Sequence, residues 1–322
     1  MGGSGASFRG RSDRGVGRPL VPLLHSVGHD VIALVRSRAA AAAAERAGAE
    51  VAWADALDPD AMSRAVRQAA PEAVVHLLTA IPAVINPKRM ARDFQLTNRL
   101  RTEGTRNLLD AAQEVGVRKV ITQGLAYAYD PDGAGLADED TAFWCTPPTQ
   151  FAANLAALQE LERRTRNAGG LVLRFGHLYG PGSIYAVDGS FTNQVRAGKA
   201  PLVGSGTAVF SFTHSHDAAT AIAAALDKDA TGALNIVDDD PAAMGQWLPF
   251  LADLLGQRPP KKVPPALARI AAGQWGVAFM TRLRGADNAR AKLRLDWRRP
   301  RYPSWRVGFP AELRLLDGAE VR

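Results

Sequence analysis

"GVGRPLVPLLHSVGHDVIALVR", residues 15–36, is the stretch that decides the fold of this chain of 322 residues. Two glycines, Gly15 and Gly17, precede an amphipathic helical segment, and the apolar run Asp30–Val35 follows it. Glycine lets the backbone approach a phosphate closely, and a helix N-terminus offers free N–H groups and a positive dipole end. The stretch predicts a phosphate-binding turn, and a flexible basic tail is the alternative interpretation.

A strand should precede that turn, yet residues 1–14 read "MGGSGASFRGRSDR". The central strand of a doubly wound sheet is apolar on both faces. We therefore expect at best a degenerate first strand at residues 6–8, with disorder over much of residues 1–14. The composition is typical of GC-rich DNA translated out of frame, and a diverged N-terminal arm is the alternative. If the arm is authentic, we expect fewer contacts to a pyrophosphate.

The following two-thirds of the chain alternate short apolar runs with helical patterns, which is typical of a parallel α/β sheet. The expected strands lie at Asp30–Val35, Ala49–Asp58, Glu72–Ala80, Arg118–Gly124 and Gly170–Gly176. The pattern predicts an α/β fold, a doubly wound parallel sheet with a smaller C-terminal lobe. We expect residues 1–182 to form the nucleotide-binding domain with 210–238 returning to it, and 183–209 and 239–322 to form the lobe.

Composition limits the partners of the chain. The net charge of +7 comes from dispersed Arg and Lys residues, so we expect no nucleic-acid partner. No apolar run approaches the roughly 20 residues that cross a bilayer, and the single cysteine, Cys145, suits a reducing compartment. His214 and His216 lack further ligands at metal-binding spacing. We expect a cytoplasmic protein with no membrane association and no metal.

Several segments together resemble the extended short-chain dehydrogenase/reductase superfamily, in particular its NAD-dependent epimerase/dehydratase group. They are residues 15–36, "TEGTRNLLDAAQEVGVRKVI" (102–121), "LRFGHLYGPGS" (173–183), "HDAATAIAAAL" (216–226), "NIVDDDP" (235–241) and "DWRRPRYPSWRVGFP" (296–310). A lone glycine pattern is weak evidence, but their order spans most of the chain. The resemblance implies a Rossmann domain that binds NAD(P), a lobe that closes over a small-molecule substrate, and a homodimer through the helix ending at Gly116 and the helix over 151–167.

The resemblance also implies cofactor-binding positions. An arginine rather than an acid after the second strand favours a 2′-phosphate, so we expect NADP, with NAD as the alternative. The alternative interpretation of Arg36 is a solvated residue at the start of a helix. For Asp55, after the third strand, the alternative is a loop-capping role. The expected cofactor-binding residues are Gly15, Gly17, Arg36, Ser37, Asp55, Ala56, Leu57, Leu78, Thr79, Ala80, Asn98, Gly176 and His177.

The acid–base chemistry normal for this superfamily is missing. The resemblance implies a Tyr as proton donor or acceptor, a Lys four residues later that lowers the pKa of that Tyr, and a Ser or Thr that holds the substrate oxygen. Here Phe151 stands at the Tyr position, Leu155 at the Lys position, and Gly124 or Leu125 at the Ser/Thr position. No tyrosine anywhere in the sequence has a lysine four residues after it, so a simple shift of register does not restore the pair.

Tyr127 is the best replacement proton donor, and His177 is a second residue near the nicotinamide end. Tyr129, two residues further on, is expected to serve packing. We therefore expect an NAD(P)-dependent oxidoreductase or epimerase-like protein that acts on a small molecule without the usual pair. The alternative from another class is a non-catalytic NADP-binding sensor of the NmrA-like kind, and a third is a chain that binds nothing.

Overall fold

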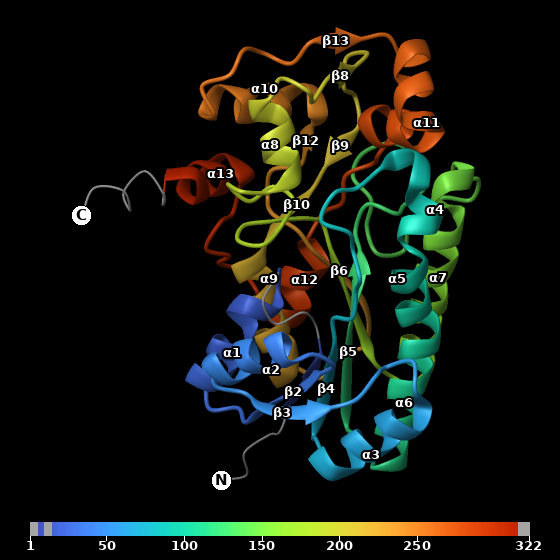
Figure 1. Cartoon of the computed structure of the whole chain (residues 1–322), viewed down its shortest axis with the longest axis vertical. Helices are drawn as coiled ribbons and strands as arrows, with labels where there is room; N and C mark the ends of the chain where they lie inside the picture. Colours follow the sequence, from blue (N-terminus) through green and yellow to red (C-terminus); the bar gives the residue numbers. More distant parts are fainter. Residues whose placement is uncertain (1–5, 10–14, 315–322) are drawn as a thin grey trace.

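The computed structural model describes residues 6–9 and 15–314 (Figure 1). A seven-stranded, wholly parallel sheet with the strand order β11-β6-β5-β4-β1-β2-β3 forms its centre. The strands are β1 (Ala6–Arg9), β2 (Val31–Val35), β3 (Glu50–Trp53), β4 (Ala73–His76), β5 (Lys119–Leu125), β6 (Leu171–Phe175) and β11 (Gly232–Ile236). The order reverses beside β1, as in doubly wound nucleotide-binding sheets. The predicted fold class is therefore confirmed.

The first strand exists and occupies the centre of the sheet. Ala6 pairs with Val31 of β2 on one side and with Ala73 of β4 on the other. Backbone hydrogen bonds to both neighbours thus hold a short segment whose sequence is poor in apolar residues. The rest of the predicted N-terminal arm, residues 1–5 and 10–14, lies outside the described residues.

Helices cover both faces of the sheet (Figure 1). One face carries α1 (Gly17–Ser26), α2 (Arg38–Arg46) and α9 (Ser215–Asp227), and the other carries α3 (Pro59–Ala69), α6 (Thr105–Glu114) and α7 (Thr149–Asn167). Helix α1 buries Leu20, Val21 and Leu24 in the core, which accounts for its amphipathic pattern. Burial on both faces accounts for the continuously apolar strands.

The long helix expected before Gly116 is interrupted. It consists of η1 (Pro87–Arg89), α4 (Met90–Asp93), α5 (Gln95–Arg99), the π-helical turn η2 (Leu100–Gly104) and α6. A π-helical turn closes its hydrogen bonds over five residues, and such turns occur frequently at functional sites. Since the extra residue rotates the side chains of the turn relative to a regular helix, η2 sets the direction in which Arg101 leaves the backbone.

A smaller lobe lies beyond the carboxyl ends of the strands (Figure 1). Its core is rich in aromatic side chains, among them the fully buried Phe210, Phe212, Trp247, Trp305 and Phe309. Its elements are β7 (His177–Tyr179), α8 (Ser190–Arg196), β8 (Leu202–Val203), β9 (Val209–Phe210), β10 (Phe212–His214), β12 (Ala242–Ala243), α10 (Met244–Leu254), β13 (Lys262–Val263), α11 (Pro265–Thr281) and α13 (Trp305–Arg314).

One helix from the segment that we assign to the lobe lies beside the sheet. Helix α12 (Ala289–Leu295) contacts β11 and α9 and buries Ala291 and Leu295 in the core under the sheet. The chain thus crosses between the two parts more than once after residue 182. The exact limits of the two domains stay a prediction.

Candidate functional site

The glycine turn ends in a helix start that can receive an anion. Gly15 has φ of +60°, a backbone conformation that favours glycine, and Gly17 is the buried first residue of α1. No side chain caps the helix, and its first turn contains no acidic residue. The free N–H groups and the dipole of α1 are therefore available to a pyrophosphate.

The residues after β2 and β3 lie at the same edge of the sheet. Ser37 caps α2 by accepting a hydrogen bond from the N–H of Ala40 at 3.2 Å. Arg36 is exposed and makes no hydrogen bond or ion pair to a described residue. Asp55 Oδ1 accepts from the N–H of Leu57 at 3.1 Å, which matches the loop-capping alternative and leaves Oδ2 for another donor.

The segment after β4 is held by side chains of the next helices. The N–H of Ala80 donates to Thr97 Oγ1 at 3.0 Å. In the neighbouring loop after β3, the carbonyl of Ala56 accepts from Asn107 Nδ2 at 2.8 Å. The N–H of Leu78, next to the half-buried Thr79, donates to the His76 ring at 3.1 Å. The predicted cofactor-binding residues of this segment therefore have an ordered backbone.

Asn98 of α5 and Asn154 of α7 join the two helices. Asn98 Nδ2 donates to Asn154 Oδ1 at 2.8 Å, while Asn98 Oδ1 and Asn154 Nδ2 are buried without a partner. Buried polar atoms are normally hydrogen-bonded. An unsatisfied acceptor and an unsatisfied donor side by side fit a polar group of a ligand, such as a nicotinamide riboside, that would lie there.

The positions that should carry the proton-handling groups are hydrocarbon. Phe151 and Leu155 are buried in the first turns of α7, and the Phe151 ring stacks on Trp275 of α11 with centroids 4.0 Å apart. A Cβ at Gly124 would stand 2.8 Å from Val172 and 2.9 Å from a Glu162 oxygen. A serine or threonine at that position would therefore collide with the packing beneath it.

His177 and Tyr127 form an aromatic cluster next to these positions. The His177 ring stacks on Tyr127 at 4.3 Å and on Phe210 at 4.1 Å, and Phe279 meets it edge-on at 5.5 Å. Burial lowers the pKa of His177 to about 3, and its Nε2 has no hydrogen-bond partner. His177 is therefore neutral at physiological pH and is a poor general acid.

Close packing by itself requires a glycine at position 176. Its N–H donates to Thr213 Oγ1 at 2.8 Å, and a Cβ there would approach the Ser211 carbonyl oxygen to 2.2 Å. Real Cβ atoms do not approach so closely. The contacts of Gly176 with Ser211 and Thr213 therefore explain why this position has no side chain: the lobe packs closely against the end of the sheet there.

Arg101, in the π-helical turn η2, was not expected from the sequence. Its side chain is buried and makes no hydrogen bond or ion pair to any described residue. Burial lowers the pKa of Arg101, and the proximity of Tyr127 offsets part of that effect. In turn, burial raises the pKa of Tyr127, which the charge of Arg101 partly offsets. A charged residue on the buried face of an amphipathic helix was the signal that could have revealed it.

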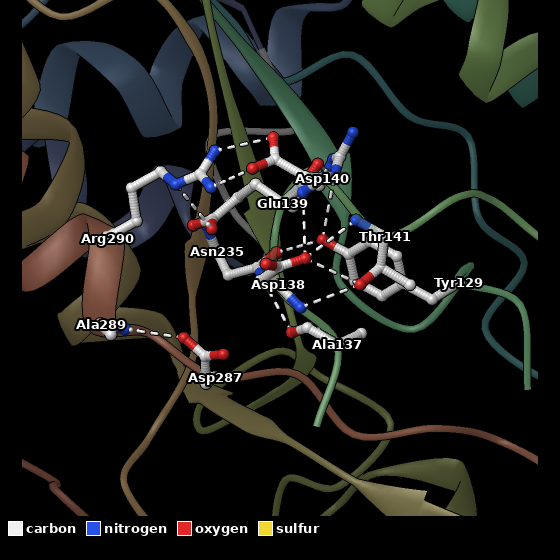
Figure 2. A network of polar contacts seen from close by, with 11 residues as sticks. Tyr129, Ala137, Asp138, Glu139, Asp140, Thr141, Asn235, Asp287, Ala289 and Arg290 are labelled. Atoms are coloured by element: carbon white, nitrogen blue, oxygen red, sulfur yellow. Dashed lines mark hydrogen bonds and ion pairs between the residues drawn. The ribbon is translucent and has the colours of Figure 1, made fainter. Parts of the chain in front are cut away.

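Tyr129 belongs to a different, extensive polar network (Figure 2). Its hydroxyl donates to Asn235 Oδ1 at 2.5 Å and accepts from Arg174 at 2.9 Å. Arg174 also binds Glu162 at 2.6 Å and the carbonyl of Glu139 at 3.0 Å. Burial raises the pKa of Tyr129 to about 12. These contacts support the prediction that Tyr129 serves packing.

A surface depression of about 430 Å³ borders that network rather than the predicted site. Two of the residues that line it, Arg174 and Glu139, already have partners: Glu139 accepts the N–H of Asn235 at 2.7 Å and pairs with Arg290 at 3.3 Å. No predicted cofactor-binding residue lines the depression. The depression is therefore separate from the predicted cofactor-binding site.

The described residues contain no helix long and apolar enough to cross a membrane. Within residues 6–9 and 15–314 there is also no group of three His, Cys, Asp or Glu side chains arranged to hold a metal ion. His214, one of the histidines considered for metal binding, instead lies 3.0 Å from Glu312.

A doubly wound sheet with a glycine turn at its switch point and orphaned polar atoms across the crevice defines a dinucleotide-binding α/β protein. The family model described as NAD dependent epimerase/dehydratase family matches residues 15–237. The chain belongs to this family, and the predicted resemblance is confirmed. It is thus an NAD(P)-dependent oxidoreductase or epimerase-like protein, and its cofactor is a nicotinamide dinucleotide.

Among curated proteins, the chain is similar to a 3-diazoavenalumate denitrifying reductase of Streptomyces sp, at 44% identity over 305 residues. The match covers 92% of this chain and 96% of that protein. Among solved structures, it resembles a UDP-glucose 4-epimerase of Thermotoga maritima with UDP-glucose at a TM-score of 0.77 and 21% identity, covering 98% and 99% of the two chains. A UDP-glucose 4-epimerase of Thermus thermophilus with NAD gives 0.72 at 21% identity, with the same coverage. The structural likeness shows the fold.

Proposed function

We propose that this protein is an NAD(P)H-dependent reductase that replaces the diazo group of a small aromatic molecule with hydrogen. The observation that carries the proposal is the hydrocarbon character of the proton-handling positions. Phe151, Leu155 and Gly124 carry no group that can exchange a proton, so reduction of a carbonyl by the usual route lacks its acid. The reaction should therefore be one that needs no proton from the protein.

Loss of a diazo group meets that requirement. A nicotinamide cofactor, when bound, would supply the hydride for the new C–H bond. As the C–N bond breaks, its electron pair leaves with N₂, so the positive charge of the diazonium group is lost and no proton is consumed. In carbonyl reduction the oxygen gains charge and must be protonated. Here the leaving group is a neutral gas, and a general acid has nothing to protonate.

The aromatic cluster suits such a substrate. Tyr127, His177 and Phe279 form a continuous set of ring faces and edges, and Trp275 extends it to Phe151 through contacts at 5.7 and 4.0 Å. Aromatic faces attract cations by about 0.5–2 kcal/mol each. A neutral His177 adds no positive charge that would repel a diazonium group.

The similarity to the Streptomyces reductase supports the same proposal. That protein is named for a diazo substrate and for a denitrifying reduction, and the match extends over almost its whole length. The likeness to sugar-nucleotide epimerases is less than half as strong in sequence identity. We therefore place the substrate of this chain among diazo compounds rather than sugar nucleotides.

We propose NADPH as the preferred cofactor because Arg36 is exposed and unpaired among the described residues. A charge-assisted hydrogen bond contributes about 1.5–3 kcal/mol. Arg36→Ala should therefore weaken NADPH binding about 10-fold or more and leave NADH binding unchanged. Fluorescence titration of both cofactors measures this, with Arg46→Ala, at the far end of α2, as the matched control.

The test of the reaction mixes purified protein, NADPH and a stable arenediazonium carboxylate. We expect one N₂ released for each NADPH oxidised, at a rate well above the protein-free control. Tight NADPH binding without any N₂ release would favour the sensor alternative. Oxidation of NADPH by simple ketones but not by the diazonium salt would contradict the proposal.

A further inference from the structure

Arg101 is an isolated charge inside the protein. Its side chain is 4% exposed, and it has no ion-pair or hydrogen-bond partner among the described residues. The effective cost of burying an ion without a partner amounts to several kcal/mol. Such a charge is retained where a ligand of opposite sign completes the site.

The groups around Arg101 do not supply that opposite charge. Tyr127, the titratable group closest to it electrostatically, has a raised pKa because of burial and is therefore neutral. His177, stacked on Tyr127, is also neutral. Asn98, three residues earlier in α5, and its hydrogen-bond partner Asn154 in α7 are uncharged amides. Within residues 6–9 and 15–314 no acidic group pairs with Arg101, and we infer that the counter-charge comes from a bound molecule.

The anionic part of a dinucleotide is at the wrong place for this role. Its phosphates are expected at the N-terminus of α1, whose free N–H groups already suit them. The nicotinamide end, expected between Leu78 and Asn98, carries no anion. The anion that reaches Arg101 is therefore part of the substrate.

We propose that Arg101 binds the carboxylate of an aromatic substrate and thereby fixes its orientation. Arg is suited to this because its planar guanidinium holds a carboxylate through two parallel hydrogen bonds. This inference rests on the proposed function: with the acid end on Arg101, the ring lies against Tyr127 and His177 and the diazo-bearing carbon faces the cofactor. The substrate class is an aromatic carboxylic acid, and neutral analogues bind weakly.

The experiment measures binding rather than turnover. The protein loaded with NADP⁺ is titrated calorimetrically with cinnamate and with the neutral cinnamamide, using wild type and Arg101→Gln. We expect cinnamate to bind the wild type at least about 10-fold more tightly than the amide, and Arg101→Gln to lose about 10- to 100-fold for cinnamate, as for a charge-assisted hydrogen bond. Affinity for the amide should change less than threefold.

Arg99→Gln is the matched control. Arg99 lies two residues earlier, is exposed, and pairs with Glu103 at 2.8 Å, so its loss should leave cinnamate binding unchanged. Arg101→Lys, which keeps the charge without the planar fork, should retain an intermediate affinity. It also serves as the second variant if Arg101→Gln does not fold, as judged by circular dichroism.

Equal affinity of cinnamate for wild type and Arg101→Gln would overturn the inference, as would a wild type that prefers the amide. The two proposals fail separately. Arg101-dependent cinnamate binding with no N₂ release from a diazonium salt leaves the carboxylate site standing and removes the proposed reaction. N₂ release that is equal in wild type and Arg101→Gln, with cinnamate affinity also unchanged, would support the proposed reaction and remove the carboxylate site.

Discussion

Arg101 and Arg174 are both buried, 4% and 3% exposed, yet their surroundings are opposite. Arg174 binds the Glu162 carboxylate, the Tyr129 hydroxyl and a backbone carbonyl. Although burial by itself lowers the pKa of Arg174, the hydrogen bond and charge of Glu162 raise it overall. Arg101 has none of these partners. A buried charge with a complete set of partners maintains the fold, whereas one without partners marks a place for a ligand.

Tyr127 and Tyr129 repeat the contrast at the end of one strand. They are two residues apart in the segment after β5, Tyr127 in a turn and Tyr129 just beyond it, but only Tyr129 enters the polar network in Figure 2. No hydrogen bond joins the Tyr127 hydroxyl to a described residue; its ring stacks on His177, and the charge of Arg101 is near enough to lower its pKa. Within three residues the chain therefore passes from the proposed ligand-binding side, at Tyr127, to a structural polar network, at Tyr129.

The largest expected effect is on stability. Arg174→Met leaves Glu162 buried and unpaired, which should lower the free energy of unfolding by about 3–5 kcal/mol. Arg101→Met removes a charge that has no partner among the described residues, so the ligand-free protein should be unchanged or more stable, by up to several kcal/mol. Urea denaturation measures both. A large loss in Arg101→Met would mean that Arg101 is also structural.

A smaller effect is a loss of stability in acid caused by His177. Its pKa is about 3 in the folded protein and about 6.5 when unfolded. Between these values the unfolded chain binds a proton that the folded chain does not, so stability falls by up to about 1.4 kcal/mol for each pH unit below 6.5. His177→Phe keeps the stacking and removes this term. Parallel curves of stability against pH for the two proteins would contradict the burial argument.

The two tyrosines give the next contrast. Tyr129→Phe removes a hydroxyl bonded to Asn235 and Arg174, and should cost about 1–3 kcal/mol in unfolding free energy. Thermal melting measures this loss against Tyr127→Phe, which should melt within a degree or two of wild type. A larger loss in Tyr127→Phe than in Tyr129→Phe would reverse the assignment of the two residues.

The smallest expected effect is on turnover. Because the proposed reaction consumes no proton, Tyr127→Phe should keep kcat with a diazonium substrate within about threefold of wild type, whereas loss of a general acid typically costs about 100-fold or more. Stopped-flow oxidation of NADPH checks this. A loss of kcat by the larger factor would instead support Tyr127 as the replacement proton donor.

Much of the fold could be predicted because it follows from repeated local patterns. The apolar runs at residues 30–35, 72–80 and 118–124 each contain a strand, and the glycines before α1 precede a helix start as expected. The central strand Ala6–Arg9 was underestimated because pairing with two neighbours, which its composition does not reveal, holds it in place. Local propensity is a weak guide where non-local hydrogen bonds decide.

The site was predicted less completely. Asn98 and His177 were singled out from the sequence, but Arg101 was overlooked because a regular helix continued past Arg99 in the expected structure. The π-helical turn changes which side chains face inward. Whether a buried charge has partners depends on residues distant in sequence. That information exists only in the folded chain.

Isotope tracing tests directly whether the hydrogen on the product carbon comes from the cofactor and not from a proton of the protein or solvent. The reaction of an arenediazonium carboxylate is run with NADPH deuterated at C4 in H₂O, and with ordinary NADPH in D₂O. We expect carbon-bound deuterium in the first product and none in the second. Deuterium taken up from D₂O at the carbon that lost N₂ would contradict it.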